Sequence, residues 1–345
     1  MSVEMTRRTF RPCWCAAGAF LIVVVMAAGC AKSGTESAAP TSTTKTQLDY
    51  AIAIHGGAGT ISKDISVERR TAYENALENV LRRGVEMLEA GGDALDTVEA
   101  VLRMMEDDPL FNAGKGAVFN HEGGHELDAS IMDGETLACG AVAGVTTVKN
   151  PISLARLVME RTPHVLLAGP GAEVFADETG VDRVDQEYFF SQRRYDAWRK
   201  TLEKKSEAKD AVRGTVGAVA LDRDGHVAAA TSTGGLTNKR FGRIGDSPVI
   251  GAGTYASDAG CAISATGKGE EFIRNAVAFQ VSMLVELQGL DVESAARQVL
   301  ESRLEPESGG VIALTTDGSI AMTFNTQAMP RAAADSTGRF EVLIW

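Results

Sequence analysis

Two threonines, Thr215 and Thr233, stand at the open end of a hairpin that the sequence predicts. Short apolar segments follow Thr215 and precede Thr233, and the Asp224-Gly225 pair between them favours a two-residue turn, because both positions tolerate positive φ. With that turn as the loop, Val216 pairs with Thr233, and a register shift of one or two residues keeps the two threonines together. Neighbouring hydroxyls of this kind could support nucleophilic chemistry.

Thr215 follows Gly214 at the end of a polar segment, where a strand is expected to begin. A threonine hydroxyl is a poor nucleophile unless a base lies beside it, and one such base is the residue's own α-amine, with a reference pKa of roughly 7.7–8.0. That amine is free only if the Gly214–Thr215 bond is cut. Gly214 suits a cut because, without a Cβ, it can hold a strained backbone with an open carbonyl.

Two further stretches carry polar side chains in glycine-rich loops. Arg243 and Asp246 could hold the carboxylate and ammonium of a free amino-acid end, since arginine binds a carboxylate bidentately. Taken alone, such a pair is more often a surface ion pair. The "TGKG" stretch at 266–269 has the composition of a phosphate loop but lacks the spacing of a P-loop. His55, beside two glycines, is expected to be structural.

"HEGGH" at residues 121–125 matches the zinc-protease signature, with His121 and His125 as ligands and Glu122 as the base. A zinc protease needs both histidines on one face of a helix, and Gly123-Gly124 costs roughly 1 kcal/mol per glycine against a helix. The flanking residues favour strands, and no third ligand follows. We therefore expect a turn here. The minor alternative is a zinc metalloprotease, whose activity chelators would inhibit.

Hydrophobic spacing predicts an α+β chain around these residues, with one polar interruption over 193–214. The expected elements are a strand at 50–54, helices at 73–88 and 95–105, strands at 117–120 and 126–132, the hairpin, and a helix over 272–283. The net charge of −12 argues against a nucleic-acid partner. Cys139 and Cys261 lie in apolar segments, which favours buried free thiols over a disulfide.

Residues 1–29 predict an export signal. A basic stretch ends at Arg11, and the apolar segment 16–28 is too short to span a membrane. Small residues then lead into Cys30, which resembles a bacterial lipobox, and residues 6–10 resemble a twin-arginine signal. We expect a lipidated Cys30, a flexible tether over 30–47, and a periplasmic or cell-envelope lipoprotein anchored to the membrane. An ordinary secretory peptide with a chance cysteine is the alternative.

Nine short motifs occur in order along the chain: "HGGAG" (55–59), "LFNAGKGAVF" (110–119), "ELDASIMDG" (126–134), "GAVAGV" (140–145), "GTVGAVALD" (214–222), "STGGLTNK" (232–239), "GRIGDSPVIGAGTYA" (242–256), "SATGKGEEFIR" (264–274) and "FNTQAM" (324–329). From residue 50 to about 331 the chain resembles the plant-type L-asparaginase/isoaspartyl peptidase family of N-terminal-nucleophile (Ntn) hydrolases. The resemblance implies an αββα sandwich over 48–345, with two β-sheets between helix layers. It also implies self-cleavage into 30–214 (α) and 215–345 (β) and an (αβ)2 homodimer.

The resemblance further implies the chemistry. Thr215 would attack the side-chain carbonyl of L-asparagine or a β-aspartyl peptide, Thr233 would tune it, and water would release L-aspartate. Thr266 and Gly267 match the oxyanion hole. The substrate-binding positions are Asn112, Arg243, Ile244, Gly245, Asp246, Thr266, Gly267, Lys268 and Gly269. No catalytic cofactor is expected; a structural sodium would be bound by backbone carbonyls of Met105, Glu106, Asp108, Phe111, Ala113 and Lys115.

Some positions depart from the family pattern, and substrate choice stays open. Lys268 stands where many relatives have a small hydroxyl residue, Arg240-Phe241 is bulkier than usual, and Ala328 replaces a glycine. The C-terminal "STGRFEVLIW" has no counterpart in the pattern. Glycosylasparagine hydrolysis is the related alternative, although the motif "GTVGAVALD" favours the asparaginase/isoaspartyl peptidase assignment over it. A non-catalytic binding lipoprotein with this fold is a third class, and it would remain uncut.

Overall fold

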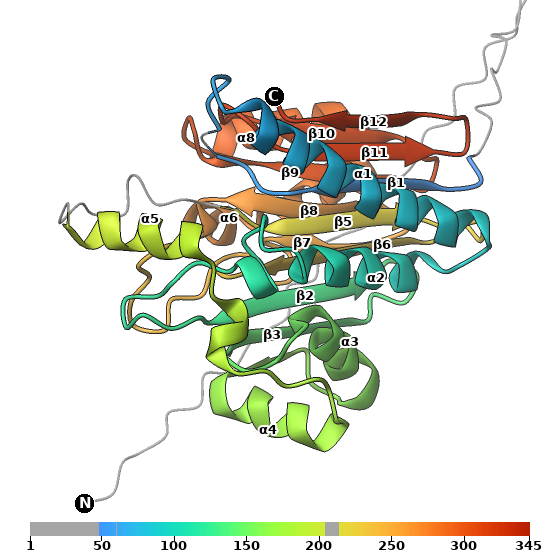
Figure 1. Cartoon of the computed structure of the whole chain (residues 1–345). Helices are drawn as coiled ribbons and strands as arrows, with labels where there is room; N and C mark the ends of the chain where they lie inside the picture. The colour runs from blue at the N-terminus through green and yellow to red at the C-terminus, as the bar shows by residue number, and fades with distance from the viewer. Residues whose placement is uncertain (1–47, 60, 204–213) are drawn as a thin grey trace, which may run out of the picture. The chain divides into compact units, whose positions relative to one another are not determined.

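Two β-sheets packed face to face hold the residues singled out above (Figure 1). The computed structural model describes residues 48–59, 61–203 and 214–345, so the predicted signal peptide, Cys30 and the tether lie outside the described residues. The strands are β1 (Ala51–His55), β2 (Leu127–Asp133), β3 (Cys139–Val145), β4 (Leu166–Ala168), β5 (Val216–Leu221), β6 (Val227–Thr233), β7 (Thr254–Tyr255), β8 (Ala262–Gly267), β9 (Gly309–Leu314), β10 (Ile320–Phe324), β11 (Arg331–Asp335) and β12 (Phe340–Leu343). The larger sheet has the order β12-β11-β1-β5-β6-β2-β3-β4, and the smaller has the order β10-β9-β8-β7.

Helices cover the outer face of each sheet. They are α1 (Val67–Glu89), α2 (Ala94–Glu106), α3 (Pro151–Arg161), α4 (Gly169–Thr179), α5 (Gln192–Glu203), α6 (Gly269–Asn275), α7 (Val277–Gln288) and α8 (Val292–Arg303), with short 3-10 turns η1 (Gly114–Gly116) and η2 (Gln186–Phe189). Helices α1, α2 and α3 pack on the larger sheet, and α7 and α8 pack on the smaller one. β5 contacts β8 and β9 between the sheets. This arrangement confirms the predicted αββα sandwich.

The central strands are buried because each has a helix layer on one face and the other sheet on the opposite face. All five residues of β1 and all of β5 and β6 are buried, and these strands are rich in alanine, with isoleucine in β1 and valine in β5 and β6. The predicted helical stripe over 73–88 is the buried face of α1. Both described cysteines are free; Cys261 is buried and Cys139 is half-buried.

Three expected elements differ in the structure. The hairpin loop has three residues (223–225) rather than two, since Leu221 pairs with Val227 and Asp222 N donates to His226 O at 3.1 Å; Gly225 in the loop adopts a φ of +88°. The segment 117–120 forms no strand, because its backbone bonds the 236–239 loop and the turn at 120–124. The helix over 272–283 breaks at Ala276 (φ +45°), where the carbonyls of residues 251 and 252 cap a new helix, α7.

Within the described part of the chain, no helix combines the length and apolarity needed to cross a membrane.

Candidate active site

The three-residue hairpin loop places the two threonines opposite each other. Strand β5 pairs Val216 with Ser232, so the next pair across the hairpin is Thr215 and Thr233. Directly opposed residues lie on the same face of a sheet. The Thr215 hydroxyl accordingly donates to Thr233 Oγ1 at 3.2 Å, and both side chains are buried.

Two side chains donate to the carbonyl oxygen of Gly214. Asn112 Nδ2 lies 2.7 Å from it, and Thr233 Oγ1 lies 3.1 Å from it. The Asn112 amide is held in this orientation because Nδ2 also donates to Gly235 O at 2.8 Å and Oδ1 accepts from Val118 N at 2.9 Å. Two fixed donors on one carbonyl oxygen polarise the carbonyl and would stabilise negative charge developing there.

The glycine loop after β1 presses against the Gly214–Thr215 bond. Gly57 has a φ of +105°, and a methyl group added to it would lie 2.7 Å from Gly214 Cα and 2.9 Å from Thr215 N. Only glycine fits this approach. The next residue, Ala58, donates its N–H to Thr266 Oγ1 at 3.1 Å. The loop thus joins the nucleophile position to the predicted oxyanion residues.

Thr266 and Gly267 end strand β8, and Lys268 and Gly269 lead into α6. A Cβ on Gly267 would lie 2.1 Å from the Ser308 carbonyl oxygen, so the backbone fits tightly here. The Lys268 ammonium lies within 4 Å of two carboxylates, those of Glu271 and Glu305. Gly269 borders the clamp, since a methyl group there would lie 2.8–2.9 Å from atoms of Arg243 and Asp246.

The predicted clamp residues do not pair with each other. The Arg243 guanidinium instead forms a bidentate pair with Glu270, with both N···O distances 2.9 Å. Asp246 is buried, which raises its pKa to about 7, and its Oδ2 has no hydrogen-bond partner among the described residues. Ile244 is partly exposed, and Gly245 packs against the Arg243 guanidinium. A buried carboxylate oxygen that receives no hydrogen bond from the protein can accept a hydrogen bond from a ligand.

His55 is the residue that sequence reasoning placed outside the site. Its Nδ1 lies 3.1 Å from Thr215 O. Because a carbonyl only accepts, Nδ1 carries the proton and Nε2 accepts from Ser264 Oγ at 3.0 Å. Burial lowers the His55 pKa to about 3, so the ring is neutral. A chain of buried hydroxyls continues from Ser264 between the sheets, through Thr231, Thr254 and Ser130.

The HEGGH segment forms a turn, as expected, with Gly123 at a φ of +85°. The His121 ring lies 2.9 Å from Asn238 Oδ1, whereas the His125 ring packs on Phe119 and contacts Val118 O. Across residues 48–59, 61–203 and 214–345, no three His, Cys, Asp or Glu side chains gather to hold a metal. This geometry does not favour the zinc alternative.

Two glycines in the segment 105–116 lie close against backbone carbonyls. A methyl group on Gly114 (φ +47°) would lie 2.3 Å from Glu106 O, and one on Gly116 would lie 2.0 Å from Phe111 O. Side chains at these two positions would collide with backbone oxygens, so both positions require glycine. The sodium site at this segment stays a prediction.

Comparison with known proteins identifies the family of the chain. A family model described as asparaginase matches residues 48–344. The chain belongs to the plant-type asparaginase family. Relatives of this asparaginase-family chain include the isoaspartyl peptidase of Escherichia coli (strain K12), 49% identical over 293 residues, covering 81% of this chain and 91% of that protein. A probable isoaspartyl peptidase/L-asparaginase 2 of Arabidopsis thaliana is 44% identical over 323 residues (86% and 99%), and a Homo sapiens isoaspartyl peptidase/L-asparaginase is 44% identical over 294 residues (82% and 92%).

The departures of this asparaginase from the family pattern differ in their surroundings. Phe241 is 95% exposed at a φ of +60°, and Ala328 is buried, where its backbone pairs with Gly59 of the glycine loop. The C-terminal stretch, for which the short motifs gave no counterpart, lies within the family-model match, which extends to residue 344. It forms the edge strand β12, and the Trp345 indole donates to Ile61 O at 3.1 Å. The C-terminus thus completes the larger sheet beside the glycine loop.

Proposed function

We propose that this chain is an isoaspartyl peptidase and L-asparaginase that releases L-aspartate with Thr215 as its N-terminal nucleophile. One observation carries the proposal: a hydroxyl relay from Thr215 Oγ1 to Thr233 Oγ1 to the carbonyl oxygen of Gly214. This relay connects the attacking group to the bond that must break. The names of the relatives support the substrate class.

Self-cleavage follows from the relay. Thr215 Oγ attacks the Gly214 carbonyl carbon, its proton passes to Thr233 Oγ1, and Thr233 passes its own proton to the carbonyl oxygen. Asn112 stabilises charge on that oxygen. The C–N bond then breaks as this proton moves to the departing nitrogen, which leaves an ester between Gly214 and Thr215 Oγ. Water hydrolyses the ester, frees the Gly214 carboxylate and exposes the Thr215 α-amine.

The same groups serve turnover. The free α-amine of Thr215 takes the hydroxyl proton, and the hydroxyl attacks the substrate's side-chain carbonyl. Thr266 and the backbone after it face the developing oxyanion. Asp246 Oδ2 accepts the substrate's α-ammonium, and Arg243 takes its α-carboxylate once Glu270 moves aside. The Thr215 ammonium returns the proton to the departing nitrogen as the C–N bond breaks, so ammonia or the amino acid leaves and an aspartyl ester remains on Thr215 Oγ. Water then hydrolyses the ester, which releases L-aspartate and restores the hydroxyl and the free amine.

Gel electrophoresis with N-terminal sequencing tests the proposal. Purified wild-type protein should give two bands, and the smaller should begin Thr-Val-Gly-Ala-Val. Thr215→Ala should stay uncut and inactive, whereas Thr215→Ser keeps the hydroxyl and should still be cut. A wild-type chain that stays intact after long incubation would count against the enzyme and favour a binding lipoprotein, and loss of activity with chelator would favour the zinc alternative.

A substrate comparison separates the alternatives within the family. We expect turnover of β-Asp-Leu and L-asparagine by the cut enzyme. A clear preference for glycosylasparagine would identify a glycosylasparaginase instead.

Three finer features complete the proposal. A structural sodium would be held by backbone carbonyls of the 105–115 loop, as the family resemblance implies; a higher melting temperature in sodium than in an organic cation would test it. Export and lipidation at Cys30 rest on the leader sequence, and acyl labelling that is lost in Cys30→Ser would test them. The (αβ)2 assembly can be tested by light scattering.

A further inference from the structure

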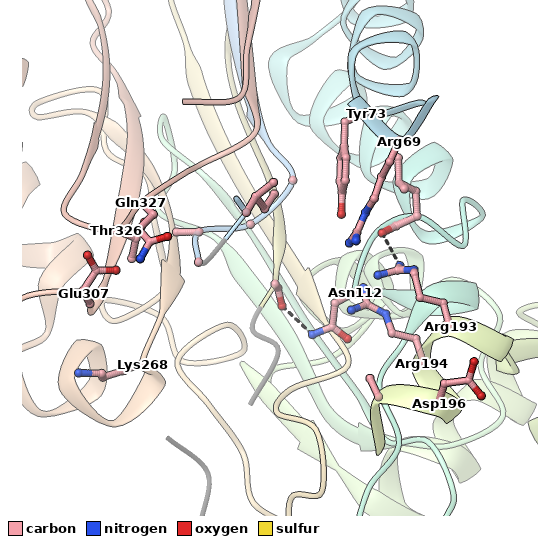
Figure 2. Close-up of a pocket in the computed structure, with 18 of the residues that line it drawn as sticks. Arg69, Tyr73, Asn112, Arg193, Arg194, Asp196, Lys268, Glu307, Thr326 and Gln327 are labelled. Carbon is pink, nitrogen blue, oxygen red and sulfur yellow. Dashed lines mark hydrogen bonds between the residues drawn. The ribbon is translucent and has the colours of Figure 1, made fainter. Parts of the chain in front are cut away.

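A cavity of about 1230 Å³ opens beside the Gly214 carbonyl. Gly214, Asn112 and the glycine loop line its middle. Lys268, Thr326 and Gln327 lie at one end, and side chains of α1 and α5 form the other (Figure 2). The clamp residues Arg243 and Asp246 do not line it. The cavity therefore leads away from the reacting bond toward a wall built by two helices.

That wall carries three arginines, Arg69 from α1 and Arg193 and Arg194 from α5, whose guanidinium groups gather on one side of Asn112 (Figure 2). Arg193 Nη2 donates to the Leu110 carbonyl at 2.9 Å, and Arg194 Nε donates to the Gly116 carbonyl at 2.8 Å. Neutral carbonyls accept the printed hydrogen bonds of these two side chains, and Asp108 offsets part of the charge of Arg193 from a distance. Among the described residues, none of the three forms a salt bridge.

Holding these cations together costs free energy. Arg194 is buried, and burial together with the charge of Arg193 lowers its pKa to about 9. Arg69 lowers the pKa values of both neighbours further. Asp196 also lines the cavity, but its side chain is on the exposed side of α5. A buried charge without a partner is strongly unfavourable, so this cluster favours an anion bound between the guanidinium groups.

Carboxylates fit such a cluster well, because each guanidinium presents parallel donors matched to two carboxylate oxygens. We propose that Arg69 and Arg193, backed by Arg194, form a subsite for the α-carboxylate of the leaving amino acid of a β-aspartyl dipeptide. The inference rests on the proposed function. In the proposed function the clamp takes the α-groups of the aspartyl half, and the clamp residues lie outside this cavity, whereas the arginines line it together with Gly214 and Asn112. The arginines therefore meet the half of the substrate that leaves.

This subsite discriminates between substrates. The leaving group of β-Asp-Leu carries a carboxylate, that of β-Asp-leucinamide carries a neutral amide, and that of L-asparagine is ammonia. Only the first can use the arginines. A charge-assisted hydrogen bond contributes about 1.5–3 kcal/mol, which corresponds to roughly 10- to 100-fold in kcat/KM.

The test compares kcat/KM for β-Asp-Leu and β-Asp-leucinamide in the cut enzyme. Wild type should prefer the free acid by about 10-fold or more, and Arg69→Gln should lower that ratio toward one. Arg82→Gln is the matched control, since Arg82 lies on the same helix but pairs with Glu78 on the surface, and it should keep the wild-type ratio. Equal rates with both substrates in wild type, or an unchanged ratio in Arg69→Gln, would overturn the subsite while leaving the proposed function in place.

Calorimetry with sodium sulfate separates the two hypotheses. Sulfate should bind wild type and Arg82→Gln and should bind Arg69→Gln at least about 10-fold more weakly. If the cut protein hydrolyses neither dipeptide, the proposed function and the leaving-group assignment are both wrong. Weaker sulfate binding by Arg69→Gln than by wild type would in that case still support an anion site at the arginines. Equal sulfate binding by all three proteins would overturn the anion site itself.

Discussion

Asp246 illustrates how burial alone can prepare a side chain for a ligand. Its carboxyl group is out of water, its pKa is raised to about 7, and one oxygen has no partner within the described chain. The neutral form is tolerated without a ligand, and an ammonium ion would favour the charged form. The sequence indicated Asp246 and Arg243 as a pair that binds the substrate. It could not reveal that Glu270, which lies in helix α6, forms an ion pair with Arg243.

The raised pKa of Asp246 predicts a pH dependence of product binding. Only the ionised carboxylate attracts the α-ammonium of L-aspartate, so the inhibition constant for L-aspartate should fall as pH rises from 6 to 8. Well below the pKa the change should approach 10-fold per pH unit, because the ionised fraction changes by that factor. Inhibition assays across this range check the prediction. In Asp246→Asn the constant should be higher and nearly independent of pH; the same slope in that variant would assign the titration elsewhere.

Glu270 competes with substrate for Arg243. The carboxylate is about half exposed, and such pairs contribute about 0.2–1 kcal/mol. Removing its charge should free the guanidinium for the substrate's α-carboxylate, so Glu270→Gln should lower KM for L-asparagine by up to about fivefold with little change in kcat. Steady-state kinetics measure both parameters. Glu74→Gln, which removes a similar surface pair with Arg70, should leave KM unchanged. A raised KM in Glu270→Gln would instead make Glu270 a substrate contact.

At the scale of elements, the periodic patterns in the sequence predicted helices and their buried faces. Contacts between segments far apart in the chain could not be predicted from the sequence. The buried face of α1 follows from spacing within one helix. The break at Ala276 does not, because the carbonyls of residues 251 and 252 cap α7 from a separate loop. The hairpin turn set the neighbourhood of Thr215 correctly, but the three-residue loop decided that Thr215 and Thr233 stand directly opposite each other. A change of one residue in the loop length shifts the register of the two strands by one residue. The amino-acid composition of a turn does not determine the loop length that closely.

The glycine loop after β1 provides an element-scale prediction. Gly57→Ala would place a methyl group 2.7 Å from Gly214 Cα, so the Gly214–Thr215 bond must shift out of the relay. We expect self-cleavage to slow by at least about 10-fold, since a shift of this size can cost a factor of 100 in a positioned reaction. Band intensities on a gel over time measure the rate. Gly91→Ala is the control, because Gly91 also has a positive φ (+84°) but a methyl group there has open space. Equal slowing in both variants would attribute the effect to backbone strain rather than to contact with the bond.

At the scale of the whole molecule, the site depends on the junction between the two sheets. His55 from β1 bonds the Thr215 carbonyl on one side and Ser264 of β8 on the other, so one ring links the larger sheet, the smaller sheet and the residue to be activated. A single sequence could place His55 at the end of a strand, but it could not reveal its partners, which come from strands far apart in the chain. A buried polar network of this kind fixes a unique arrangement only if all its members are satisfied.

The buried His55 ring predicts how stability responds to acid. Burial lowers its pKa to about 3 in the folded chain, whereas the unfolded chain titrates near 6.5. Between these values the unfolded state binds more protons, so the stabilisation is complete above about pH 6.5 and is lost as pH falls toward 3, by at most about 1.4 kcal/mol per pH unit. In an uncut Thr215→Ala background, His55→Gln should be less stable at pH 7 but lose less stability between pH 6.5 and 4.5, since glutamine stays neutral. Urea unfolding at several pH values measures both slopes. His164→Gln, at an exposed histidine, should keep the parent slope. Parallel slopes in the parent and His55→Gln would mean that His55 is not held neutral at the junction.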